Sequence, residues 1–207
     1  WTNWFENGHV KSIGTFVHDV PSGKWVLFDE SGAPQFGYYR NGVPDGAWTF
    51  WYTNGHKAAE GDYDLGKAVG KWYYYHPNGQ LETKGRFKDG MRHGERTYYD
   101  ETGRKTAEGD FAEDQRDGEW TEWGPTGLEK KTTYDKGTVV AMSEELSRYL
   151  NGKKRETVTY NVSGGQIMPQ AMLTVWYENG RKMEEGPSLN GQRAGEWIAM
   201  APNGRVT

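Results

Sequence analysis

Large aromatic residues recur along the chain at a regular interval, separated by short polar stretches and by glycines. One series of glycines follows Asn, Ser or Thr at steps of 23 or 24 residues: Gly8, Gly32, Gly55, Gly79, Gly103 and Gly127. A second series has the same steps: Gly23, Gly46, Gly70, Gly94 and Gly118. Self-similarity at a fixed period is the signature of a tandem-repeat protein, and this period gives about nine copies of one unit.

Each repeat has the composition of a β-hairpin. The segments between glycines have about five to seven residues, the usual length of a strand. Asn-Gly pairs occur at 7–8, 54–55, 78–79, 179–180 and 203–204, and they predict type I′ turns, which need positive φ at both central residues. Because one hairpin is marginal in water, neighbouring hairpins must pair. The sequence therefore predicts an all-β protein, an elongated single-layer antiparallel sheet of about nine hairpins.

The aromatic residues fall into columns that stacked repeats would align. The first column includes Trp25, Trp48, Trp72 and Trp120, with Arg96 as an exception, and the second, three residues on, includes Trp51, Tyr75, Tyr99 and Trp123. We expect both columns to be structural, since a thin sheet has little else to bury. Strict alternation would place the columns on opposite faces, whereas a bulge would bring them together. The sequence leaves this choice open.

A third set of rings is a candidate binding surface. Phe50, Tyr74 and Tyr98 share one offset in three successive repeats and directly precede the second column. Alternation puts these rings on the face opposite that column. Unless a second layer covers them, they form a partly exposed aromatic stripe rimmed by charged residues, which is typical of a binding site. Its ligand could be a protein, a sugar polymer or a peptide strand.

The repeat pattern is interrupted in one place. Residues 138–172 contain one hairpin signal, at Asn151-Gly152, and residues 142–150 have the spacing of a short helix. We expect a degenerate repeat with an insertion near 138–148 and a loop near 163–170. The predicted organisation is regular repeats over 1–137, the degenerate repeat over 138–172 and terminal repeats over 173–207, as one continuous array.

Charge and composition narrow the possible partners. The chain has 25 basic and 29 acidic residues, interleaved, with a net charge of −4. Nucleic-acid binding needs clustered cations, and anionic lipid attracts basic surfaces. The interleaved charges therefore favour neither a nucleic-acid partner nor membrane binding. The chain has no Cys and begins at Trp1. We expect a bacterial, exported protein, in the periplasm, the cell envelope or outside the cell, rather than a cytoplasmic one.

The sequence offers no catalytic constellation. None of His9, His18, His56, His76 and His93 has metal-ligand spacing to another histidine. Acidic residues recur with the repeat, as at Glu60 and Glu108, so they fit turns and solvated positions better than a catalytic pair. No nucleophile elbow, phosphate loop or dinucleotide fingerprint is present. We predict a protein that is not an enzyme and that uses no metal or cofactor.

The repeats resemble a variant of the membrane occupation and recognition nexus (MORN) repeat, in the bacterial form grouped as the YwqK-type antitoxin family. One copy carries Gly46, Trp48, Trp51, Asn54, Gly55, Glu60, Gly61, Tyr63 and Gly66. The next carries Gly70, Trp72, Tyr75, Asn78, Gly79, Gly85, Phe87, Asp89 and Gly90. The resemblance covers about 1–137 and 173–207, and it implies a curved single-layer sheet of hairpins. It implies less about activity, because a repeat fold does not determine one.

Three functions follow from these features. The first is a non-enzymatic scaffold whose aromatic face binds a protein. The second is a binder of cell-envelope glycan, in which rings such as Tyr74 stack on sugars. The third, carried by the resemblance alone, is an antitoxin or immunity protein that binds a toxin.

Overall fold

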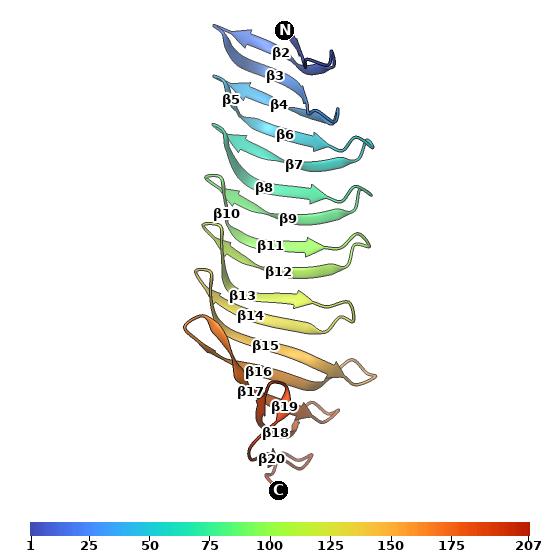
Figure 1. Cartoon of the computed structure of the whole chain (residues 1–207), viewed down its shortest axis with the longest axis vertical. Coiled ribbons are helices and arrows are strands. Elements are labelled where there is room, and N and C mark those ends of the chain that lie inside the picture. The colour runs from blue at the N-terminus through green and yellow to red at the C-terminus, as the bar shows by residue number, and fades with distance from the viewer. The chain divides into compact units, whose positions relative to one another are not determined.

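The computed structural model describes residues 1–207, which form twenty β-strands and no helix (Figure 1). Neighbouring strands pair in antiparallel fashion. The chain divides into two compact units, the first made of Trp1–Lys105 with Phe111–Asp114, the second of Thr106–Asp110 with Gln115–Thr207. The predicted all-β fold of antiparallel hairpins is confirmed.

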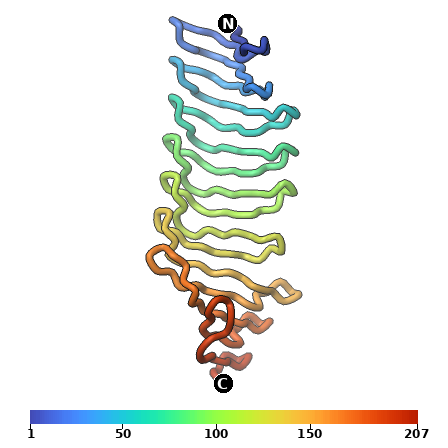
Figure 2. Tube along the Cα trace, viewed as in Figure 1, coloured from blue at the N-terminus to red at the C-terminus, as the bar shows by residue number.

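The first unit is a ladder in which each long strand pairs with the strands before and after it. Figure 2 shows the turns of this unit alternating between the two ends of its strands. The strands are β1 (Thr2–Trp4), β2 (Val10–Val17), β3 (Val20–Phe28), β4 (Pro34–Arg40), β5 (Val43–Pro44), β6 (Gly46–Trp51), β7 (Lys57–Asp64), β8 (Lys67–Tyr75), β9 (Leu81–Lys88), β10 (Met91–Arg92) and β11 (Gly94–Tyr99).

The second unit repeats the same consecutive pairing from β13 to β18, and β18 then pairs with both β19 and β20. The residues of β12 (Lys105–Ala112) are divided between the two units. The other strands are β13 (Gln115–Trp123), β14 (Glu129–Asp135), β15 (Thr138–Arg148), β16 (Lys154–Ser163), β17 (Gln166–Trp176), β18 (Lys182–Leu189), β19 (Gln192–Arg193) and β20 (Ile198–Ala199).

The five Asn-Gly turns named above are not the type I′ turns that we predicted, whereas Asn41-Gly42, which that prediction did not include, has positive φ at both residues. In the turn of Asn54 and Gly55 only the glycine has positive φ, at 85°. The Asn54 Oδ1 accepts a hydrogen bond of 3.0 Å from the His56 amide, and the Gly55 amide donates to the Tyr52 carbonyl at 3.1 Å. An asparagine that bonds the backbone two residues on favours this turn, and one left-handed residue is then enough. The hairpins themselves are where the pattern placed them.

Type I′ turns occupy the other end of the hairpins. Leu65 and Gly66 both have positive φ, at 47° and 85°, and they join β7 to β8 through a two-residue loop. The same geometry joins β9 to β10 at Asp89 and Gly90, with φ of 54° and 87°. The twist of a type I′ turn matches that of the strands it joins.

The number of repeats agrees with the count from the sequence. At nine turns a left-handed glycine donates its amide to the carbonyl three residues earlier: Gly8, Gly32, Gly55, Gly79, Gly103, Gly127, Gly152, Gly180 and Gly204.

Tryptophan and glycine alternate in one row across the strands of the first unit. Trp25 pairs with Gly14 and Gly37, and Trp72 pairs with Gly85. Trp25, Trp48 and Trp72 are 3–5% exposed, and we call their side of this unit the tryptophan face. Each indole lies on a glycine of the preceding strand, so the wide residue always has a neighbour without a side chain. The core of the unit is this row.

A second row of rings packs edge-on against the indoles. Tyr39 lies edge-on to Trp25 and Trp48, with centroid separations of 5.6 and 5.4 Å, and Tyr63 lies edge-on to Trp72 at 5.1 Å. Each such pair stabilises a protein by about 0.5–1.5 kcal/mol beyond the area it buries. The indole N–H of Trp48 donates to the Tyr38 carbonyl at 3.1 Å. Rings from neighbouring repeats therefore interlock in a single layer.

The second aromatic column lies on the opposite face, which answers the question that the sequence left open. Cross-strand pairing places Thr49, Glu60, Tyr73 and Lys84 on that face. The Tyr75 hydroxyl donates to Glu60 Oε1 at 2.6 Å, so Tyr75 belongs there as well. Each face of the first unit therefore has its own aromatic column.

Residues 138–172 differ from our prediction. The expected helix over 142–150 does not form, because these residues belong to the long strand β15 and its following turn. The expected loop near 163–170 is a two-residue turn at Gly164 and Gly165, with φ of 56° and 79°, that leads straight into β17. The hairpin at Asn151-Gly152 is present. The extra residues lengthen β15, β16 and β17 to 11, 10 and 11 residues.

Candidate functional site

The three rings of the predicted stripe lie on the tryptophan face and are half-buried. Phe50 is stacked against Trp48 at 5.9 Å and lies 6.2 Å from Trp72, and Tyr74 is stacked against Trp72 at 6.0 Å. As expected, they occupy the face opposite Tyr75. The indoles beside Phe50 and Tyr74 are the reason that these two rings are only partly exposed, and the Arg96 guanidinium takes that place beside Tyr98.

Small residues separate these rings along their row. Ala59 pairs with both Phe50 and Tyr74, and Thr83 pairs with both Tyr74 and Tyr98. Ala59 and Thr83 are buried. Because each ring is two strands from the next, the rings stand about 10 Å apart. Burial raises the pKa of Tyr74 above its ordinary value, against the lowering effect of the Arg96 charge.

Arg96 interrupts the tryptophan row at the end of this stripe. Its guanidinium lies between Tyr74, Phe87 and Tyr98, at 5.3, 5.5 and 5.8 Å from the ring centroids. The residue is 8% exposed, and its Nη1 has no hydrogen-bond partner. The arginine stacks on its ring neighbours as the missing indole would, but it brings a buried positive charge to the tryptophan face.

On the opposite face, Glu60 organises the second column. Lys57 Nζ lies 2.7 Å from Glu60 Oε2 and 5.9 Å from the centroid of Tyr75. Burial would raise the pKa of Glu60, but the hydrogen bonds from Lys57 and Tyr75 outweigh it and lower the value. Burial and the bond to Glu60 raise the pKa of Tyr75 to about 12. This cluster is internally paired and offers no free charge to a ligand.

Exposed apolar residues gather on that face near β2 and β4. Ile13, Phe36 and Tyr38 are 45%, 44% and 44% exposed. They line a groove of about 710 Å³ together with Val26. We did not predict this groove. The alternate positions of Phe36 and Tyr38 could have indicated that both rings lie on one face of the sheet.

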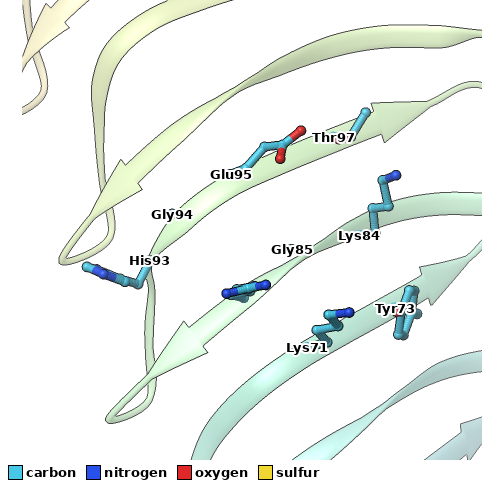
Figure 3. Close-up of a pocket in the computed structure, with 9 residues that line it drawn as sticks. Lys71, Tyr73, Lys84, Gly85, His93, Gly94, Glu95 and Thr97 are labelled. Atoms are coloured by element: carbon cyan, nitrogen blue, oxygen red, sulfur yellow. The ribbon is translucent and has the colours of Figure 1, made fainter.

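A second groove on that face is basic. It lies over β8, β9 and β11, has a volume of about 630 Å³, and is lined by Lys71, Tyr73, Lys84, Arg86, Glu95 and Thr97 among others. Figure 3 shows Lys71 and Tyr73 on one strand, Lys84 on the next, and Glu95 and Thr97 on the third. We did not predict this site either, because a cluster of three cations spread over two strands is not contiguous in the sequence.

The second unit has its own grooves, in the segment outside the regular repeats. One of about 550 Å³ is apolar, with Leu146, Tyr160, Ile167 and Met168 in its lining. Another of about 430 Å³ holds the buried carboxylate of Glu145, whose Oε1 lies 3.0 Å from Lys154 Nζ.

Two histidines connect successive turns. His56 Nδ1 lies 2.7 Å from the Pro77 carbonyl, and His76 Nε2 lies 2.9 Å from the Tyr99 carbonyl. His9, His18 and His93 are exposed. No cluster of three or more His, Asp or Glu side chains is placed to hold a metal ion.

The structure contains no helix with the length and apolar character needed to cross a membrane.

These features define a tandem β-hairpin repeat protein with several open grooves. The family described as MORN repeat variant matches residues 1–18, 44–64 and 68–89, so these segments are similar to MORN repeats. The matched segments lie in the first unit and include Phe50 and Tyr74. No curated protein matches the chain.

Proposed function

We propose that this chain is a non-enzymatic protein-binding module whose partner lies on the tryptophan face against Phe50, Tyr74 and Tyr98. The observation that carries the proposal is the repetition of one half-buried ring in three successive repeats, with small buried residues between the rings. Rings fixed by packing lose little entropy on binding and contribute large contact areas.

The similarity to the MORN repeat variant supports a binding role, since MORN repeats are commonly modules that bind proteins or membranes. A narrower role, as an antitoxin that neutralises a toxin by direct binding, rests on the resemblance to the YwqK-type family. This antitoxin role requires that the protein bound to the tryptophan face be a toxin.

The proposal is tested by capturing partners with the immobilised chain and with the variant Tyr74→Ser with Tyr98→Ser. The matched control is Phe36→Ser with Tyr38→Ser, which removes two rings from the opposite face. Retention of a stoichiometric protein by the wild type and by the control, with loss in the stripe variant, is expected. All three chains are first compared by circular dichroism and thermal unfolding, so that misfolding is not mistaken for lost binding.

Two results would contradict the proposal. Capture of cell-envelope polysaccharide in place of a protein would favour the glycan-binding function. Loss of the protein in the control alone would move the binding site to the groove around Phe36 and Tyr38.

A further inference from the structure

The basic groove holds positive charges that the protein does not neutralise. No carboxylate oxygen lies within 4.0 Å of a side-chain nitrogen of Lys71, Lys84 or Arg86. Other cations of the chain are paired, as in Arg92 with Asp114 at 2.9 Å and Arg116 with Glu122 at 3.0 Å. Three cations without a carboxylate partner therefore share one groove of a protein whose net charge is −4.

The arrangement costs stability in the isolated chain. Lys71 and Arg86 are direct cross-strand partners on β8 and β9. Like charges opposite each other in an antiparallel pair are destabilising, since their Cβ atoms are only about 5 Å apart. Glu95 is the one acidic residue that lines the groove. A bound anion would relieve the repulsion that remains.

The fold does not require cations at these positions. The residues 24 positions earlier are Ala47, Glu60 and Asp62, and those 24 positions later are Glu95, Glu108 and Asp110. The hairpin forms in every one of these repeats, so it tolerates an acidic or a small residue at each place. The positive charge is a property of this one repeat.

The spacing of the cations indicates the form of the ligand. Lys84 and Arg86 are alternate residues of β9 and point to the same face, so their Cβ atoms are about 7 Å apart. Alternate side chains of an extended peptide have the same separation. The hydroxyl group of the half-buried Tyr73 lies beside them in the groove and can bond a peptide backbone.

From this geometry we propose that the basic groove binds an acidic peptide segment of a partner protein, with Asp or Glu at alternate positions. Lys84 and Arg86 pair with two successive carboxylates of the segment, and Lys71 adds a third contact across the strand. Arginine binds a carboxylate through two parallel hydrogen bonds, which gives the site directionality. This site goes beyond the proposed function, because it lies on the face opposite Phe50, Tyr74 and Tyr98.

The test uses the whole chain and a defined probe, so it does not depend on finding the natural partner. The isotope-labelled chain is titrated with a short peptide of alternating glutamate and serine, and amide chemical shifts are recorded. We expect saturable shifts confined to β8, β9 and β11. Affinity should fall as ionic strength rises from about 0.05 to 0.5 M, because salt screens exposed charge pairs.

Variants locate the interaction. Lys84→Glu with Arg86→Glu should weaken binding by at least about tenfold, since attraction becomes repulsion. Lys136→Glu with Arg155→Glu makes the same change in net charge at exposed positions outside the groove, and it should leave the affinity within about twofold. Thermal unfolding of both variants confirms that they are folded.

Several outcomes would overturn the proposal: equal binding of a glutamine-for-glutamate peptide, no binding of the glutamate peptide, or unchanged binding by the groove variant. Tighter binding of a short single-stranded oligonucleotide than of the glutamate peptide would reassign the groove to nucleic acid. Because Tyr74 and Tyr98 are untouched in these experiments, failure here leaves the proposed function standing.

Discussion

The indole of Trp72 lies against Gly61 of the neighbouring strand, so closely that a Cβ atom on Gly61 would come within 2.2 Å of the ring. The same contact recurs between Trp48 and Gly37, at 2.1 Å. Neither glycine has positive φ. The requirement for glycine here is space for the indole, which differs from the requirement at the turns.

Replacing Gly61 with alanine should therefore lower the free energy of unfolding by about 1–3 kcal/mol, the cost of overpacking a tight core. Gly124→Ala is the matched control, because its Cβ would meet nothing closer than 3.9 Å and its φ is not positive. That control should stay within about 0.5 kcal/mol of the wild type. Chemical denaturation measures the free energy of unfolding of both variants. Equal losses would show that the contact with the Trp72 indole is not what makes Gly61 necessary.

Arg96→Trp should stabilise the protein by about 1–2 kcal/mol, since it removes a buried unpartnered donor and restores the tryptophan row over Gly85. Arg96→Met serves as the control, because it removes the charge without adding a ring. A gain in melting temperature with tryptophan alone would assign the effect to the indole. A loss with tryptophan would show that the stacked guanidinium is the better fit between Tyr74 and Tyr98.

The bond from Tyr75 to Glu60 should make stability depend on alkaline pH. The pKa of Tyr75 is raised to about 12 in the folded chain, above the ordinary value of 10.0. The contribution of this tyrosine is therefore complete below pH 10 and is lost as the pH rises towards 12. Tyr75→Phe should lower the melting temperature at neutral pH, and its difference from the wild type should shrink across that window. A constant difference would contradict the assignment.

Asp100 should contribute to stability at neutral pH but not in acid. Hydrogen bonds, first from the Thr102 hydroxyl and then from the Arg104 and Thr102 amides, hold the pKa of this carboxyl well below its usual range. A depressed pKa adds stability that is present above the unfolded value and disappears as the pH falls. Asp100→Ala should therefore melt earlier than the wild type at pH about 7 and closer to it at pH about 2. Glu30→Ala is the control, because it removes an exposed carboxyl that makes no hydrogen bond or ion pair.

The sequence was sufficient to predict the hairpins, their number and the two aromatic columns. Local chemistry determines these features: glycines mark the turns, and the period of 24 residues aligns Trp48 with Trp72. The site residues Phe50, Tyr74 and Tyr98 were also assigned to the correct face, because alternation along a strand is a property of the backbone.

Other features depended on residues that are distant in the sequence. The segment 142–150 has helical spacing, yet residues 142–148 belong to β15, because β14 and β16 provide paired edges on both sides. The five Asn-Gly pairs used for the turn prediction form a different turn, in which the Asn side chain accepts a backbone hydrogen bond. The type I′ turns lie at the other end of the hairpins, where Asn41-Gly42 is one of them.

The sequence by itself determined the repeat, the all-β class and the placement of Phe50, Tyr74 and Tyr98 opposite the second column, since each follows from residues close together in the chain. The structure decided that the two columns lie on different faces. Only the tertiary structure decided which rings are exposed and where unpaired charge gathers. Exposure of Tyr74 depends on the indole of Trp72 beneath it, and the basic groove requires Lys71 and Arg86 to meet across two strands. Register between strands sets both, and no single segment of sequence encodes it.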